Sequence, residues 1–92
     1  MINLKNKSVV VTGGTKGIGI EITKCFLKQN AKVFVLARQK PKRSIQAKGN
    51  KAVFIECDIR NIDSLDDAVK QIKGLSKSID VLINNAGGAP MA

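Results

Sequence analysis

The apolar residues of the chain fall into short runs that alternate with segments of helical spacing. Nearly consecutive positions are apolar in four of these runs, at residues 7–12, 32–37, 52–57 and 80–84. Strands that are apolar on successive positions rather than on alternate ones are buried on both faces, as in a parallel sheet. The pattern therefore predicts repeated β-α-β units in one α/β domain built on four parallel strands.

Two of the intervening segments have the spacing of amphipathic helices. The first follows residues 7–12 and ends near Asn30, a residue type that tolerates the left-handed conformation at a helix terminus. Its predicted inward face consists of Ile18, Ile22, Cys25, Phe26 and Gln29. The second helix is predicted at residues 62–73, with Asn61 as its N-cap. Its predicted inward stripe consists of Ile62, Leu65, Val69 and Ile72.

The link at residues 38–51 has a weaker pattern. Pro41 suits the first position of a helix, because its missing N–H group would have no partner there in any case. The tripeptide at residues 48–50, Lys-Gly-Asn, suits a helix end. These two signals predict a short helix in the link.

Four glycines lie within the nine residues VTGGTKGIG, at positions 11–19, between the first predicted strand and the first predicted helix. Ligands bind at this edge of a parallel sheet. Glycine permits backbone conformations closed to other residues, and the free N–H groups at a helix start attract phosphate. The turn is thus a candidate phosphate site, although a glycine-rich turn without a ligand has the same spacing.

Three motifs in this order resemble those of the short-chain dehydrogenase/reductases. TGGTKGIG resembles the T-G-x-x-x-G-x-G cofactor loop of that family, with Thr12, Gly13, Gly17 and Gly19 on the matching positions. Asp58 stands where the family carries an acid near adenine, and NNAG at residues 84–87 resembles the motif that ends its fourth strand.

The resemblance implies a Rossmann-type fold with strand order 3-2-1-4, in which residues 1–92 form the N-terminal nucleotide-binding part. It implies that the motif glycines line a pyrophosphate, that Asp58 meets the adenine amino group, and that residues 85–87 border a ribose. Thr12 and Asn84 would support the two loops by hydrogen bonding. The candidate cofactor-binding residues are Gly13, Thr15, Lys16, Gly17, Ile18, Gly19, Arg38, Asp58, Ile59, Asn85, Ala86 and Gly87.

The charges near the end of the second strand bear on the choice of cofactor. A site for NAD usually carries Asp or Glu about 20 residues beyond the glycine turn, to accept hydrogen bonds from the ribose 2′-OH. Ala37 occupies that place here, followed by Arg38, and Lys16 lies in the glycine turn. Two cations and no carboxylate favour NADP(H) over NAD(H), because guanidinium and ammonium groups pair with a 2′-phosphate. The alternative is that both cations are solvated surface charges.

A net charge of +9 over 92 residues makes nucleic acid a candidate partner. The basic residues that form one stretch without an acid are Arg38, Lys40, Lys42, Arg43, Lys48 and Lys51. The only aromatic residues are Phe26, Phe34 and Phe54, all within predicted core elements, which leaves none to stack on bases. Nucleic-acid binding is therefore disfavoured.

The remaining composition excludes several classes of protein. No apolar run approaches the length of about 20 residues that spans a membrane, and the first residues lack the apolar segment of a signal peptide. A cytoplasmic protein is expected. Without histidine or a C-x-x-C motif, neither a metal site nor a disulfide is expected, and Cys25 and Cys57 are predicted to be small buried residues.

Catalytic residues cannot be assigned. The resembled family uses a Y-x-x-x-K pair with an upstream serine, whereas this chain has no tyrosine and all its serines precede residue 84. The chain is expected to be a cofactor-binding fragment, inactive alone, of an oxidoreductase acting on a carbonyl or alcohol substrate; the alternative is a noncatalytic nucleotide-binding or interaction module. An uncovered edge at residues 80–84 would expose apolar side chains and favour self-association.

Overall fold

The computed structural model describes residues 3–13 and 15–85. Its main sheet contains β1 (Ser8–Thr12), β2 (Lys32–Ala37), β5 (Val53–Glu56) and β6 (Val81–Asn84). These strands are parallel and lie in the order β5-β2-β1-β6. This arrangement confirms the predicted α/β fold; the strand numbers differ from 3-2-1-4 because two short strands intervene in the chain.

β1 lies inside the sheet, with β2 on one side and β6 on the other. All five of its residues are buried. Val10 illustrates the register, since it is opposite Phe34 on β2 and Leu82 on β6. The continuous apolar run of β1 is required because side chains on both of its faces enter a core.

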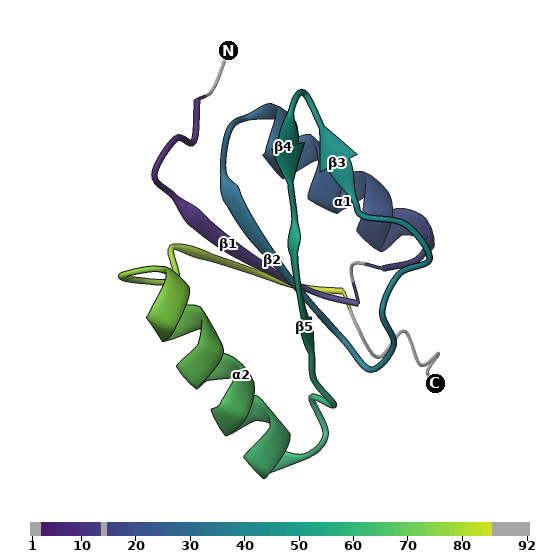
Figure 1. Ribbon diagram of the computed structural model, residues 1–92, viewed down its shortest axis with the longest axis vertical. Helices are drawn as coiled ribbons and strands as arrows, with labels where there is room; N and C mark the ends of the chain where they lie inside the picture. The colour runs from purple at the N-terminus through teal and green to yellow at the C-terminus, as the bar shows by residue number, and fades with distance from the viewer. Residues whose placement is uncertain (1–2, 14, 86–92) are drawn as a thin grey trace.

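The two helices lie on opposite faces of the sheet (Figure 1). α1 (Gly17–Lys28) packs on the face to which Val9 and Val11 belong. α2 (Ile62–Leu75) packs on the face of Val10, through Ala68 and Ile72. Successive residues of β1 therefore contribute to two separate apolar clusters, and the sheet is the middle of three layers.

The predicted inward face of α1 is correct only in part: Ile22 and Phe26 pack against the cluster of Val9 and Val11, whereas two other predicted positions are exposed. Ile18 is 73% exposed and Cys25 is exposed. The fully buried positions are Gly19, Thr23 and Leu27, spaced four residues apart. Gly19 brings no side chain to the interface, and the Thr23 hydroxyl donates to the Gly19 carbonyl at 2.8 Å, so this polar group is buried with a partner. The buried face of α1 thus combines Leu27 with one small and one polar position that hydrophobicity alone does not identify.

The start of α2 agrees with its prediction. The Asn61 side chain accepts a hydrogen bond from the Ser64 N–H at 3.1 Å, which confirms the N-cap. Ile72 is buried and Leu65 packs against the same cluster as expected, but Ile62, in the first turn, is 73% exposed. Asn30, with φ of 70°, has the left-handed conformation predicted after α1.

The link between β2 and β5 contains a hairpin in place of the predicted short helix. β3 (Gln46–Ala47) pairs antiparallel with β4 (Asn50–Lys51). The two turn residues, Lys48 and Gly49, have φ of 51° and 79°, as a two-residue turn of type I′ requires. Gly49 is thus a turn residue rather than part of a helix end.

Large apolar side chains are exposed beside β6. Leu75, Ile79 and Leu82 are 50%, 43% and 63% exposed, and Leu82 lies on the α2 face of the sheet. The exposure of Leu82 agrees with the expectation for residues 80–84, whereas Val81 and Ile83 are half-buried on the other face. In contrast, Phe34 is fully buried and Phe26 and Phe54 are half-buried. Cys57 is buried as predicted.

Two negative findings apply to residues 3–13 and 15–85. No helix in these ranges is long and apolar enough to cross a membrane. No group of three or more histidine, cysteine or acidic side chains in the same part of the chain is placed to hold a metal ion.

Two glycines test the backbone assignments in opposite directions. Gly74 lies in α2 and Gly49 in the hairpin turn, and a Cβ atom would meet no neighbour at either position. Gly74→Ala should raise the free energy of unfolding by about 0.5–1 kcal/mol, since alanine favours a helix. Gly49→Ala should lower it by about 1–2 kcal/mol, since φ is left-handed there. Urea unfolding followed by circular dichroism measures both, and effects of equal sign would contradict the assignments.

Candidate functional site

The carboxyl ends of the parallel strands meet at one edge of the sheet. β1 ends at Thr12, and the next residue, Gly13, donates its N–H to the Leu36 carbonyl of β2 at 2.8 Å. The Cys57 N–H after β5 donates in turn to the Ala37 carbonyl at 2.9 Å. The loops that follow β1, β2 and β5 therefore start side by side.

The glycine turn has the backbone geometry that its composition predicts. Gly13 has φ of 70° and Gly17 has φ of 49°, both left-handed. A Cβ atom on Gly17 would meet open space, so this glycine is required by its conformation rather than by crowding. The chain thus leaves β1 through a sharp turn and enters α1 within a few residues.

The start of α1 has no side-chain cap. Lys16 is the N-cap residue, but its side chain accepts no hydrogen bond from the helix, and the first turn contains no acid. Of the other candidates, Thr15 is half-buried, while Ile18 is exposed. The N–H groups at a helix start without a side-chain cap, with a lysine beside them, can receive an anion.

A cluster of hydrogen bonds joins the glycine turn to the end of β6. The Thr12 hydroxyl lies 3.1 Å from Asn84 Oδ1, which is the support predicted from the sequence. The Asn85 N–H donates to Thr12 Oγ1 at 3.0 Å. The Asn85 side-chain amide donates to the Gly13 carbonyl at 3.2 Å. These contacts fix the distance between the two loops.

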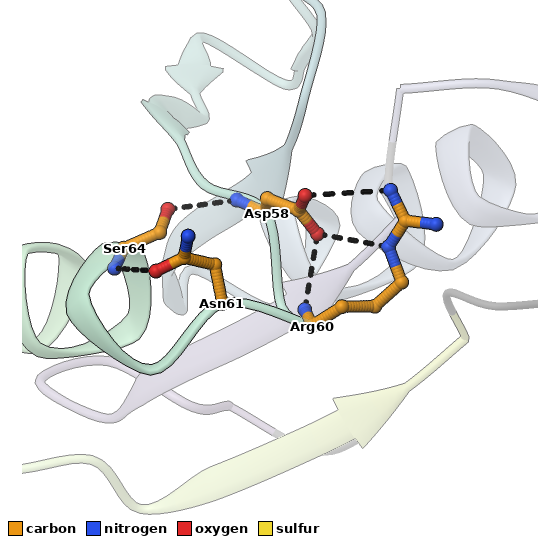
Figure 2. A network of polar contacts seen from close by, with 4 residues as sticks. All are labelled: Asp58, Arg60, Asn61 and Ser64. Atoms are coloured by element: carbon orange, nitrogen blue, oxygen red, sulfur yellow. Dashed lines mark hydrogen bonds and ion pairs between the residues drawn. The ribbon is translucent and has the colours of Figure 1, made fainter.

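Asp58 follows β5 and carries an ion pair that the sequence analysis did not anticipate. Arg60 Nε donates to Asp58 Oδ1 at 3.1 Å, and Arg60 Nη2 donates to Oδ2 at 3.3 Å (Figure 2). The Arg60 backbone N–H also donates to Oδ1, at 3.0 Å. The guanidinium fork thus holds both carboxylate oxygens.

The backbone of Asp58 is held by the first turn of α2. Its N–H donates to Ser64 Oγ at 2.8 Å, and the Ser64 N–H donates to the Asn61 side chain (Figure 2). The N-cap of α2 and the position of Asp58 therefore depend on the same serine. Ile59, the next candidate, is half-buried against the α2-side cluster.

The electrostatics of Asp58 favour its charged form. The pKa of Asp58 is lowered from 3.8, chiefly by the Arg60 side-chain hydrogen bonds and next by the Arg60 backbone N–H, with a smaller contribution from the Arg38 charge. Arg38 is exposed, but it lies near enough to act on this carboxylate. A carboxylate has about four acceptor positions, so Asp58 retains capacity for a further donor beside its three bonds to Arg60.

The structure therefore brings Gly13, Asp58 and Asn85 to one edge of the sheet, with Lys16 and Arg38 exposed. Ala86 and Gly87 lie outside the described residues. Arg60 was missed because it matches no motif; an arginine two residues after an acid in a loop is the only signal that the sequence offers.

The comparison with protein families matches residues 7–92 to the short chain dehydrogenase model. Ketoacyl reductase HetN of Nostoc is 36% identical over 92 residues, covering 95% of this chain. The chain spans only about a third of the length of that relative, 32%.

Solved structures give the same assignment. The NADH-dependent reductase A1-R′ complexed with NAD superposes with a TM-score of 0.79 and 28% identity, covering 92% of this chain and 38% of that one. A variant of the actinorhodin polyketide ketoreductase with NADPH gives a TM-score of 0.75 and 28% identity, covering 95% and 35%. With a family match over nearly its whole length and this Rossmann-like sheet, the chain belongs to the short-chain dehydrogenases.

Proposed function

We propose that residues 1–92 form the cofactor-binding N-terminal part of an NADP(H)-dependent oxidoreductase. The observation that carries this proposal is the joining of the left-handed Gly13 turn to Asn85, at the sheet edge where Asp58 also lies. A dinucleotide needs a phosphate site, an adenine site and a ribose site along one crevice, and this edge offers a group for each.

Each part of the cofactor has a partner in this assignment. The pyrophosphate would lie against the turn at Gly13, Gly17 and Gly19, where α1 starts without a side-chain cap. The adenine amino group would donate to Asp58, whose charged form is favoured. Asn85, together with Ala86 and Gly87, would border a ribose. Thr15, Ile18 and Ile59 would line the same crevice.

The choice of NADP(H) depends on Arg38 and Lys16. Both side chains are exposed and would pair with a 2′-phosphate, while the Ala37 side chain has no oxygen to accept a hydrogen bond from a free 2′-OH. The solved relatives named above include one bound to NAD and one bound to NADPH, so the preference rests on this chain's own residues.

The nicotinamide supplies hydride exchange with a carbonyl or alcohol carbon. This chain would bind and orient the cofactor, and a full-length protein would add the general acid and the substrate site. HetN is named a ketoacyl reductase, so oxoacyl groups are one candidate class of substrate. We also propose the cytoplasmic location expected from the sequence. Self-association would occur through β6, where Leu82 is exposed.

The cofactor preference is tested by exchanging residues 37 and 38. The chain should bind NADPH about tenfold to a hundredfold more tightly than NADH, since charge-assisted hydrogen bonds contribute about 1.5–3 kcal/mol. The double variant Ala37→Asp with Arg38→Ile should abolish or reverse this ratio in calorimetric titrations.

Arg43→Ile is the matched control, because it removes an exposed arginine of the same link. The control should still bind NADPH more tightly than NADH. In the unmodified chain, the ratio of the two affinities should fall as the salt concentration is raised. A wild type that prefers NADH, or a double variant that still prefers NADPH, would refute the assignment of Arg38.

Turnover by the chain alone is a separate test. The sequence contains no tyrosine to act as the general acid of the family. The purified chain should therefore bind the cofactor without oxidising NADPH in the presence of oxoacyl, sugar or simple ketone substrates. Protein-dependent loss of NADPH absorbance that co-purifies with the chain would contradict this. Absence of any nucleotide binding would instead favour an interaction module.

The Asp58 ion pair gives a pH prediction. A pKa lowered by folding means that the ionised carboxylate stabilises the folded state above its unfolded pKa, and that this contribution is lost as pH falls through the folded pKa. Arg60→Gln should raise the Asp58 pKa toward 3.8, so that the variant is less stable than the unmodified chain at neutral pH and its stability falls less as the pH is lowered.

Arg38→Gln is the control, and it should raise the pKa less, because Arg38 is the smaller contributor. Carboxyl-carbon NMR titration reports the pKa of Asp58 in each variant. An equal or larger rise in Arg38→Gln would show that the ion pair does not control Asp58.

A further inference from the structure

The face of the sheet that carries α1 has a pocket outside the candidate cofactor site. Val35 on β2 and Phe54 on β5 are register partners, so their side chains lie on the same face of the sheet. Together with Pro41, Ile45 and Ala52 they line a cavity of about 320 Å³. The remaining two lining residues are Lys40 and Ser44.

The pocket exists because the link after β2 forms no helix at this place. Residues 38–45 have no regular secondary structure, and the hairpin begins only at Gln46. Ile45 is buried and anchors this link in the α1-side core. The Ala52 N–H donates to the Ile45 carbonyl at 2.9 Å, which closes the base of the hairpin beside the cavity. The link thus passes over β2 and β5 and leaves the Phe54 ring half-exposed to the space between them.

The lining has the composition of a small-molecule site. Ligand pockets have volumes of about 300–1,000 Å³, with mostly apolar and aromatic walls and a few polar groups. Here five apolar residues form the walls, and one ammonium and one hydroxyl group supply the polar contacts. The lining contains no acidic side chain.

The positive charge around the pocket favours a negatively charged ligand. Lys40 lies in the stretch at residues 38–51, which holds six cations and no acid. A one-signed field over an apolar cavity raises the local concentration of oppositely charged molecules. A small inorganic anion would leave the half-buried Phe54 and Ala52 side chains without an apolar partner, whereas an anion with a ring or short hydrocarbon body would cover them.

We propose that this pocket binds a small organic anion, with its apolar body against Phe54 and Ala52 and its carboxylate or sulfonate group at Lys40 and Ser44. The site is distinct from the glycine turn and does not depend on the proposed cofactor. Lys40 and Ser44 supply charge-assisted and neutral hydrogen bonds, and the sheet supplies the apolar floor.

Naphthalenesulfonate is the probe for this site. Titrated into the isotope-labelled chain, it should shift the amide signals of Ser44, Ile45 and Phe54 in proton–nitrogen NMR spectra. Neutral naphthol and the small anion methanesulfonate should each bind at least about tenfold more weakly, because each lacks one of the two required parts. Shifts confined to Gly13 and Gly17, or to the exposed apolar residues Leu75, Ile79 and Leu82, would overturn the proposal.

Variants separate the two contributions. Lys40→Glu should weaken naphthalenesulfonate at least about tenfold, since it replaces attraction by repulsion at an exposed position. Lys70→Glu changes the net charge equally but lies on α2, on the opposite face of the sheet, and should bind as the unmodified chain does. Ala52→Leu should fill the cavity and abolish binding. A proton–nitrogen NMR spectrum with the signal dispersion of the unmodified chain shows that this variant is folded. Equal affinities for Lys40→Glu and Lys70→Glu would refute the site.

Discussion

The pairing of β1 with a parallel neighbour on each side is the interaction on which the rest of the structure depends. Hydrogen bonding to β2 and β6 leaves no free edge on β1, and its five residues are buried from both faces. Val9 and Val11 face one helix and Val10 the other, so one strand belongs to both apolar clusters. Because all neighbours are parallel, every loop that follows a strand of this sheet starts at the same edge.

The candidate site is a consequence of that edge. Thr12, the last residue of β1, contacts both Asn84 and Asn85. The Asn85 side-chain amide also donates a hydrogen bond to the Gly13 carbonyl. Asp58 is placed there by β5 and is held by the first turn of α2. Polar side chains thus join the loops that follow β1 and β6, while the loop that follows β5 is held by its own polar contacts beside them.

Much of this arrangement could be predicted from the sequence, because the strands are continuous apolar runs and the glycine turn follows one of them. The inward face of α1 was predicted only in part: Ile22 and Phe26 pack inward as expected, but the buried Gly19 and Thr23 were missed because hydrophobicity scores them as neutral or polar. The hairpin was also missed: its turn depends on left-handed φ at Lys48, a residue type that carries no turn signal. Arg60 acts through a local ion pair that no spacing rule identifies.

The central claim is that one edge of the sheet holds a dinucleotide. Amide chemical shifts of the chain during titration with NADPH test it most directly. Binding should shift Gly13, Gly17 and Asp58 together with one affinity, and should leave Ser8 and Lys32, at the opposite ends of β1 and β2, unchanged. Shifts spread over the basic surface without Gly13, or none at all, would contradict the account.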